Sequence, residues 1–204
     1  MIKNLALDFR LIFGVILAHL LLYFSFYDKA IFWYIFTGSI LVLITYSMLQ
    51  GDVDDDLSFL YYLFLGIISG LLLYAVIWLG NFLIHVAALP FDKEIKNLYK
   101  WFAPSLFWHY LALVLVAAPG EELFWRGFVQ KRLLRYVKPA FAIITGALLY
   151  ASVNIYTGSI LLVLASFLSG IVWGTLYYRK KSMPLVIVSH IIFDLLIFII
   201  LPLT

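Results

Sequence analysis

The chain contains no cysteine among its 204 residues. Disulfide bonds, thiol nucleophiles and metal sites built from thiolates are therefore excluded together. Charge is also scarce, because Asp, Glu, Lys and Arg make up only 12% of the sequence, about half their share in an ordinary soluble domain. The net charge is +3, and no internal repeat, low-complexity tract or nucleic-acid-binding motif is present. We therefore expect no nucleic-acid partner and no thiol-based chemistry.

Apolar residues fill the sequence instead. They make up 65% of the chain and give it a mean hydropathy of +1.06. A hydrocarbon core about 30 Å thick requires about 20 apolar residues of helix, and several stretches approach or exceed that length. Lipid offers the backbone no hydrogen-bond partner, and the long apolar runs lack the alternation of a β-barrel. The sequence predicts an all-α, polytopic membrane helical bundle, with residues 1–204 forming one integral membrane domain.

The apolar runs predict seven transmembrane helices. Residues 81–89 prolong the third of them beyond what a bilayer requires, as a tilted extension or an interfacial segment. An eighth transmembrane crossing is the alternative. The seven predicted spans are residues 9–26, 31–49, 57–79, 104–124, 139–156, 159–178 and 184–203.

Lys and Arg are unevenly distributed among the loops, and this imbalance sets the orientation of most membrane proteins. With the N-terminus inside, ten of these residues fall on the inner side and four on the outer side. The acidic loop at residues 50–58 is also inner, although it has no Lys or Arg. We therefore expect a multi-pass protein with a cytoplasmic N-terminus. The inner set is Lys3, Arg10, Arg126, Lys131, Arg132, Arg135, Lys138, Arg179, Lys180 and Lys181, and the outer set is Lys29, Lys93, Lys96 and Lys100.

Two adjacent carboxylates occur at the end of the fourth span, in the stretch GEELFWRGF at residues 120–128. Charge inside a membrane is costly and usually functional. Glu122 and Arg126 are four residues apart and can form an ion pair on one face of a helix. Glu121 points about 100° away and has no such local partner. We interpret Glu122 and Arg126 as a structural pair and Glu121 as the functional carboxylate. The alternative is that both glutamates reach the membrane interface as helix-end charges.

A second polar group occurs in the last span, in the stretch SHIIFD at residues 189–194. His190 and Asp194 are four residues apart and therefore share one face of the helix. Each needs a polar partner or a hydrated cavity inside the membrane. A hydrogen-bonded packing role is the alternative for a single histidine, but the pair together indicates a functional site.

At these two motifs the sequence resembles a known family. EELFWR matches the EExxxR motif, and HIIFD the HxxxN/D motif, of the CAAX prenyl protease and bacteriocin-processing (CPBP) family of glutamic-type intramembrane proteases. The stretch at residues 167–194, with a glycine-bearing helix, a basic turn and a proline before the last helix, is also similar to that family. The resemblance covers residues 104–200, which we expect to form the catalytic core. Residues 1–103 would then be N-terminal accessory helices, and we expect the protein in a bacterial or archaeal cell membrane.

The sequence departs from the family at one motif. The family has FxxxH between the other two, where this chain has YASVN, so that Asn154 stands at the histidine position. In the family, the first glutamate and this histidine are thought to activate a water, and the last motif stabilises the oxyanion. The resemblance implies that Glu121 is the general base and that His190 and Asp194 lie near the substrate carbonyl. Asn154 can hold a water but cannot exchange a proton with it, and an ionised Asp194 would orient His190.

The same side chains raise the question of a metal. Glu121, His190 and Asp194 are chemically acceptable ligands for zinc. The resemblance implies a metal-free mechanism instead, and the family histidine that could have added a ligand is missing. We therefore expect no metal and no cofactor, with zinc as the disfavoured alternative.

Together these features predict an intramembrane endopeptidase that works near the inner face of a membrane. It would hydrolyse a peptide bond of a membrane-associated or C-terminally tagged peptide or protein substrate, using a water activated by Glu121. The alternative, raised by Asn154, is a catalytically silent relative that acts as a binding, immunity or scaffold protein. A small transporter or channel would need ionisable groups throughout the bilayer, whereas here they cluster at one depth. The expected partners are the substrate and the lipid bilayer, and the sequence does not predict an oligomeric state.

Overall fold

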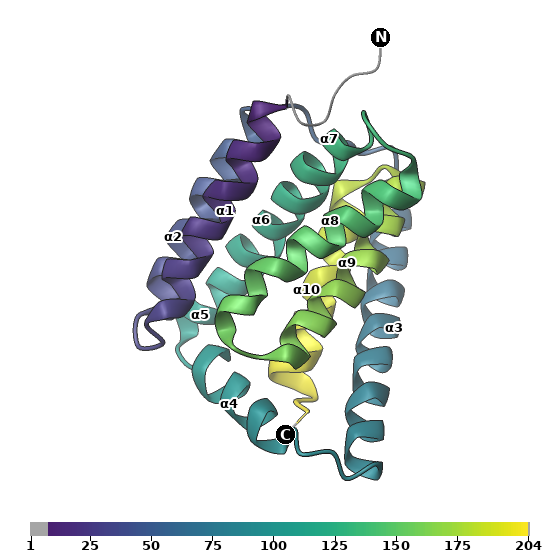
Figure 1. Ribbon diagram of the computed structural model, residues 1–204. Helices are drawn as coiled ribbons and strands as arrows, with labels where there is room; N and C mark the ends of the chain where they lie inside the picture. The colour runs from purple at the N-terminus through teal and green to yellow at the C-terminus, as the bar shows by residue number, and fades with distance from the viewer. Residues whose placement is uncertain (1–7, 204) are drawn as a thin grey trace.

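The computed structural model describes residues 8–203, and over this range the chain is helical and forms no β-strand, as predicted (Figure 1). The first half comprises α1 (Phe9–Tyr27), α2 (Phe32–Met48), α3 (Phe59–Val86) and the short α4 (Asp92–Phe102). An unbroken helix from Phe107 to Leu133 follows, made of α5 (Phe107–Ala112), η2 (Leu113–Ala117), α6 (Ala118–Glu122), η3 (Leu123–Gln130) and α7 (Lys131–Leu133). The chain ends with α8 (Pro139–Val153), η4 (Asn154–Thr157), α9 (Ile160–Lys180), α10 (Met183–Leu195) and η5 (Leu196–Ile200).

Five helical segments of the described chain are long and apolar enough to cross a membrane, namely α1, α3, α8 with η4, α9, and α10 with η5. A sixth is reached if α4 and the helix at Phe107–Leu133, which meet at 98°, form one bent span. α2 is apolar but has only 17 residues. Each of the seven predicted segments contains a helix, but a count of seven or eight crossings is not confirmed. Residues 81–86 continue α3 and form no crossing of their own.

The two ends of the bundle (Figure 1) differ in their numbers of Lys and Arg residues. We call one end, which holds the start of α1, α7 and the turn between α9 and α10, the basic end. The opposite end, where α4 lies, is the α4 end. Four cations belong to the α4 end, and eight of the predicted inner set belong to the basic end. Arg126 is a correction to that set because its side chain is buried within the bundle, and Lys3 lies outside the described residues.

The helix at Phe107–Leu133 changes its register on both sides of the paired glutamates. η2 and η3 are π-helical, and α6 lies between them. Pro119 lies in the first turn of α6, and proline inside a helix has no N–H to donate and crowds the preceding carbonyl. Wider π-helical turns accommodate such a defect and are frequent at functional sites. The helix also runs nine residues beyond the predicted span end at residue 124, so Glu121 lies about 18 Å from Leu133.

Glycines let α3 approach α10 closely. A Cβ atom at Gly66 would lie 2.7 Å from the Val188 side chain, and one at Gly70 would lie 2.6 Å from the Ser189 carbonyl oxygen. Two small residues spaced four apart are a common contact between membrane helices. This contact fixes the part of α10 that carries His190.

A polar network joins loops and helices at the basic end. Asp8 accepts hydrogen bonds from Arg132 at 2.9 and 3.0 Å and from the Tyr136 hydroxyl at 2.8 Å. Lys131 donates to Asp54 at 2.8 Å, and Tyr177 donates to the same carboxylate at 2.6 Å. The acidic loop therefore pairs with Lys131 of α7, which explains how a loop without Lys or Arg lies at this end.

Asp8 gives a testable pH dependence. Burial raises the pKa of its carboxyl. The hydrogen bonds from the Leu11 N–H, Tyr136 and Arg132 together lower this pKa by more than burial raises it, so the net pKa is below the usual value of 3.8. A group with a depressed folded-state pKa contributes stability above its unfolded pKa, and this stability is lost as pH falls through the folded value. Asp8→Asn should therefore lower the free energy of unfolding by about 1–3 kcal/mol at pH 7, and the difference from wild type should shrink below pH 4.

Thermal unfolding in detergent between pH 3 and pH 7 measures this effect. Asparagine retains the ability to cap α1, so Asp8→Ala, which loses the cap as well, should be less stable than Asp8→Asn. A constant gap between wild type and Asp8→Asn across this pH range would contradict the prediction.

Candidate active site

A cavity of about 170 Å³ lies inside the bundle, between the helix at Phe107–Leu133, α8, α9 and α10. Four of the six predicted site residues line it, namely Glu121, Asn154, His190 and Asp194. The other two, Glu122 and Arg126, lie directly behind His190 and Tyr150, which also lines the cavity. Residues from four separate segments of the chain thus meet at one place.

Glu122 is the centre of a buried charge cluster. Its Oε1 atom accepts hydrogen bonds from Arg126 at 3.0 Å and from His190 Nδ1 at 2.8 Å. Glu122 is 0% exposed, Arg126 2% and His190 5%. The i,i+4 ion pair predicted from the sequence is present, and the contact with His190 on α10 adds a second partner. A carboxylate held by two cationic or donor groups is poorly suited to act as a base.

The arrangement determines which nitrogen of His190 faces the cavity. Because Nδ1 lies against the Glu122 carboxylate, it carries the proton of a neutral ring. Nε2 lies 3.6 Å from Asp194 Oδ2, beyond hydrogen-bond distance. A neutral His190 would accept a hydrogen bond at Nε2, and a protonated His190 would donate one there. The contact of His190 is therefore mainly with Glu122, whereas the sequence analysis paired it with Asp194.

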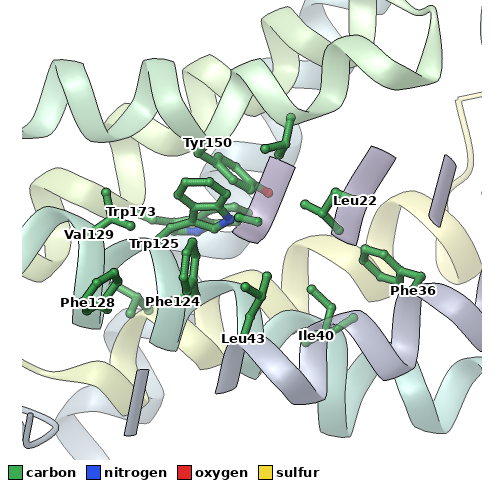
Figure 2. Close-up of a cluster of buried hydrophobic side chains, with 14 of the residues drawn as sticks. Leu22, Phe36, Ile40, Leu43, Phe124, Trp125, Phe128, Val129, Tyr150 and Trp173 are labelled. Carbon is green, nitrogen blue, oxygen red and sulfur yellow. The ribbon is translucent and has the colours of Figure 1, made fainter. Parts of the chain in front are cut away.

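Aromatic rings hold the charge cluster in place. Arg126 lies over the Tyr150 ring at 4.6 Å and near the Trp173 ring at 5.2 Å. The His190 ring stacks on Trp173 with the centroids 3.9 Å apart. Guanidinium groups are attracted to aromatic faces. The buried apolar cluster of the bundle (Figure 2) includes Leu22, Phe36, Ile40, Leu43, Phe124, Trp125, Phe128, Val129, Tyr150 and Trp173.

Glu121 has a different environment from Glu122. It lines the cavity, and its Oε2 atom accepts a hydrogen bond from the Tyr150 hydroxyl at 2.6 Å. Tyr150 was not among the site residues predicted from the sequence, although it is the first residue of the YASVN stretch and lies one helical turn before Asn154. The spacing of four residues between Tyr150 and Asn154 could have indicated that both lie on one face of a helix. Glu121 is thus the carboxylate that faces open space, held by a neutral donor.

Asn154 also reaches the cavity, but its amide is partly engaged. Its Nδ2 atom donates to the backbone carbonyl of Tyr150 at 3.2 Å, and the chain turns into η4 at this residue. The remaining donor and the side-chain oxygen of the amide are available to hold a water. No second histidine accompanies it, since His190 is the only imidazole among the described residues that line the cavity.

A metal centre needs several ligating side chains close together. Among residues 8–203, no group of three His, Asp or Glu side chains is placed to hold a metal ion. Two carboxylates, Glu121 and Asp194, and one imidazole, His190, line the cavity, and such groups can exchange protons with a water. The metal-free reading from the sequence stays a prediction.

The cavity continues into an apolar groove of about 330 Å³ between α3, α4, α9 and η5. Cavity and groove share five lining residues, namely Phe102, Leu162, Ala165, Ile197 and Phe198. Both lie toward the α4 end. This corrects the expected depth of the site, because the long helix at Phe107–Leu133 places Glu121 well away from the basic end.

Comparison with known proteins gives one match. The family model described as type II CAAX prenyl endopeptidase Rce1-like matches residues 103–196. No curated protein and no solved structure matches the chain. The matched segment contains Glu121, Tyr150, Asn154, His190 and Asp194, and it coincides with the region in which the sequence resembles CPBP proteases. Through this segment the chain is similar to the CAAX prenyl endopeptidases.

Proposed function

We propose that the protein is an intramembrane endopeptidase that hydrolyses a peptide bond of a membrane-associated or C-terminally tagged peptide or protein substrate. One observation carries the proposal: Glu121 and His190, from separate helices, face the same cavity while Glu122 is held in a buried ion pair. This arrangement gives the two glutamates different roles. Glu121 is the base, and Glu122 with Arg126 positions His190.

In the proposed reaction, Glu121 takes a proton from a water, and the resulting hydroxide attacks the scissile carbonyl carbon. The negative charge on the carbonyl oxygen is stabilised by Nε2–H of protonated His190. Asp194 favours that protonated state through its proximity to Nε2. Glu121 then delivers its proton to the leaving amine nitrogen as the C–N bond breaks. Tyr150 keeps the Glu121 carboxylate in place, and Asn154 holds the water. No metal and no cofactor takes part.

The surroundings support an apolar substrate within the lipid bilayer. The groove next to the cavity is lined almost entirely by aliphatic and aromatic side chains, which favours an apolar segment flanking the scissile bond. Residues 1–103 are proposed to be accessory, because α1 to α3 pack around the segment that contains the site. We further propose a bacterial or archaeal cell membrane with the N-terminus in the cytoplasm, on the basis of the Lys and Arg distribution.

The proposal is tested by cleavage in reconstituted membranes. A candidate substrate is first sought as a membrane protein whose size changes when the gene is deleted. His190→Ala should lower kcat by about 10²–10³-fold, the typical effect of removing one oxyanion donor. His85→Ala is the matched control, because His85 hydrogen-bonds the Asn81 carbonyl, pairs with Asp92 and does not line the cavity.

The competing function is a catalytically silent relative that binds a partner in the same cavity. Asn154, at the position of the family histidine, favours it. That function predicts no turnover by the wild type or by Asn154→His, together with partner binding that His190→Ala weakens. Turnover by the wild type that Asn154→His increases would support the protease.

A further inference from the structure

We infer that Ser166 and Ser169 of α9 form a subsite that hydrogen-bonds the main chain of a peptide substrate beside the scissile bond. Only the identification of the ligand as a peptide rests on the proposed function. The subsite itself rests on two buried hydroxyls that line the cavity and have no hydrogen-bond partner among residues 8–203. It deepens the proposed function by naming the part of the substrate that the cavity wall recognises.

Several hydroxyl groups in the apolar helices of this protein are bonded to their own backbone. Thr37, Thr45, Ser47 and Thr175 each donate to the carbonyl oxygen four residues earlier, at 2.6–2.9 Å. Thr175 belongs to α9 itself. This bonding is expected in an apolar environment, because a hydroxyl without a hydrogen bond is costly away from water.

Ser166 and Ser169 depart from this pattern. They are 6% and 3% exposed, and both line the cavity. Within the described part of the chain, neither hydroxyl is bonded to its own backbone or to another side chain. Their spacing of three residues places them on one face of the helix, about 5–6 Å apart. The bundle therefore leaves two hydroxyls free to bind a ligand in the cavity.

The two serines lie between the apolar groove and the charge cluster. Ala165, next to Ser166, lines both the cavity and the groove. Trp173, four residues after Ser169, stacks on His190. A peptide segment that extends along α9 from the groove to His190 therefore passes both hydroxyls.

A peptide main chain is the ligand chemistry that two such hydroxyls fit. A substrate that leaves water for this cavity loses hydrogen bonds to its N–H and C=O groups, and each unpaired group is costly. A serine hydroxyl donates one hydrogen bond and accepts others, so it can serve either group. An extended chain advances about 3.3 Å per residue, so hydroxyls about 5–6 Å apart reach main-chain groups one to two residues apart. Main-chain contacts let the site take apolar segments of different sequence.

The hydrogen bonds of the site favour binding over a nucleophilic role for these serines. A nucleophilic serine needs a base within hydrogen-bond distance. In the described bundle, Glu121 is bonded to Tyr150 and His190 to Glu122, and neither is bonded to a serine. We therefore assign the two hydroxyls to the substrate and not to the bond-breaking step.

Binding of a model peptide tests the inference without requiring cleavage. The probe is an octapeptide of alternating Leu and Ala with a terminal fluorophore. It is titrated with Glu121→Gln protein in detergent micelles, and fluorescence anisotropy gives Kd after subtraction of empty micelles. A second probe, an octadecyl chain with the same fluorophore, is apolar but has no peptide groups. Ser166→Ala, Ser169→Ala and the double variant are compared in this background, with Ser47→Ala as the matched control, because the Ser47 hydroxyl is bonded to the Leu43 carbonyl outside the cavity.

Each single substitution in the cavity should raise Kd for the peptide about twofold to tenfold, the effect of losing one neutral hydrogen bond, and the double variant should raise it further. Ser47→Ala should leave this Kd unchanged. The Kd of the octadecyl probe and the midpoint of thermal unfolding should also stay unchanged, because neither cavity hydroxyl has a partner within residues 8–203.

Peptide binding that the double variant leaves unaltered overturns the inference. An equal loss of affinity for both probes does so as well, since the hydroxyls would then only shape the cavity. Failure of the octapeptide to bind the Glu121→Gln protein is a third contrary result. Binding needs no turnover, so a catalytically silent protein can pass this test, and an active one can fail it.

Discussion

Glu121→Gln is expected to lower kcat for peptide cleavage by about 10²–10⁴-fold, the usual contribution of a general base. Glutamine has nearly the same size and can still accept a hydrogen bond from Tyr150, but it cannot take a proton from water at neutral pH. KM should change little, because the substitution preserves the shape of the cavity. Initial rates of cleavage by the reconstituted protein, at several substrate concentrations, separate the two parameters.

Asp56→Asn is the matched control for this change. It makes the same carboxylate-to-amide substitution at an exposed position of the acidic loop, outside the cavity, and it should leave kcat unaltered. Cleavage by Glu121→Gln at the wild-type rate would show that another group activates the water, and the assignment of the base would fall.

Glu122→Ala is expected to destabilise the protein by about 3–5 kcal/mol, because it leaves the Arg126 guanidinium buried without its carboxylate. Arg126 is 2% exposed, and its side chain has no other acidic partner among the described residues. His190 loses its Nδ1 acceptor at the same time. The midpoint of thermal unfolding in detergent measures the loss, and cleavage should be lost together with the fold.

A double variant separates stability from positioning. Glu122→Leu combined with Arg126→Met removes both charges and replaces them with apolar side chains, a change that is often neutral or stabilising for a buried ion pair. We expect it to recover most of the thermal stability while His190 remains without its partner and cleavage stays low. Full activity in this variant would mean that Glu122 does not position His190.

Much of the fold could be predicted from the length of the apolar runs, because a bilayer allows few alternatives to a helix. The ion pair of Glu122 and Arg126 followed from the spacing of two residues on one helix. The contact of Glu122 with His190 could not be found in this way, because it depends on how α6 and α10 are rotated relative to each other. From the sequence alone, His190 was therefore paired with Asp194, which lies four residues later on the same helix.

The extent of the helix that carries the glutamates was predicted less well. The charged residues Glu121, Glu122 and Arg126 indicated the end of the span, which the sequence analysis placed at residue 124, whereas the helix continues through π-helical turns on both sides of α6 to Leu133. Because the helix continues to Leu133, Glu121 lies farther from the basic end than the sequence suggested. The cavity beside Glu121 therefore lies toward the α4 end. Tyr150 was missed because the family motif drew attention to Asn154, four residues later.

The close approach of α3 to α10 at Gly66 and Gly70 has a consequence for any attempt to shorten this protein. The region matched by the family model begins at residue 103 and excludes α3, yet the backbone beside His190 rests directly on that helix. Expressing the matched segment alone would remove the helix against which α10 packs. The boundary of the family therefore does not mark a boundary at which the polypeptide can be divided.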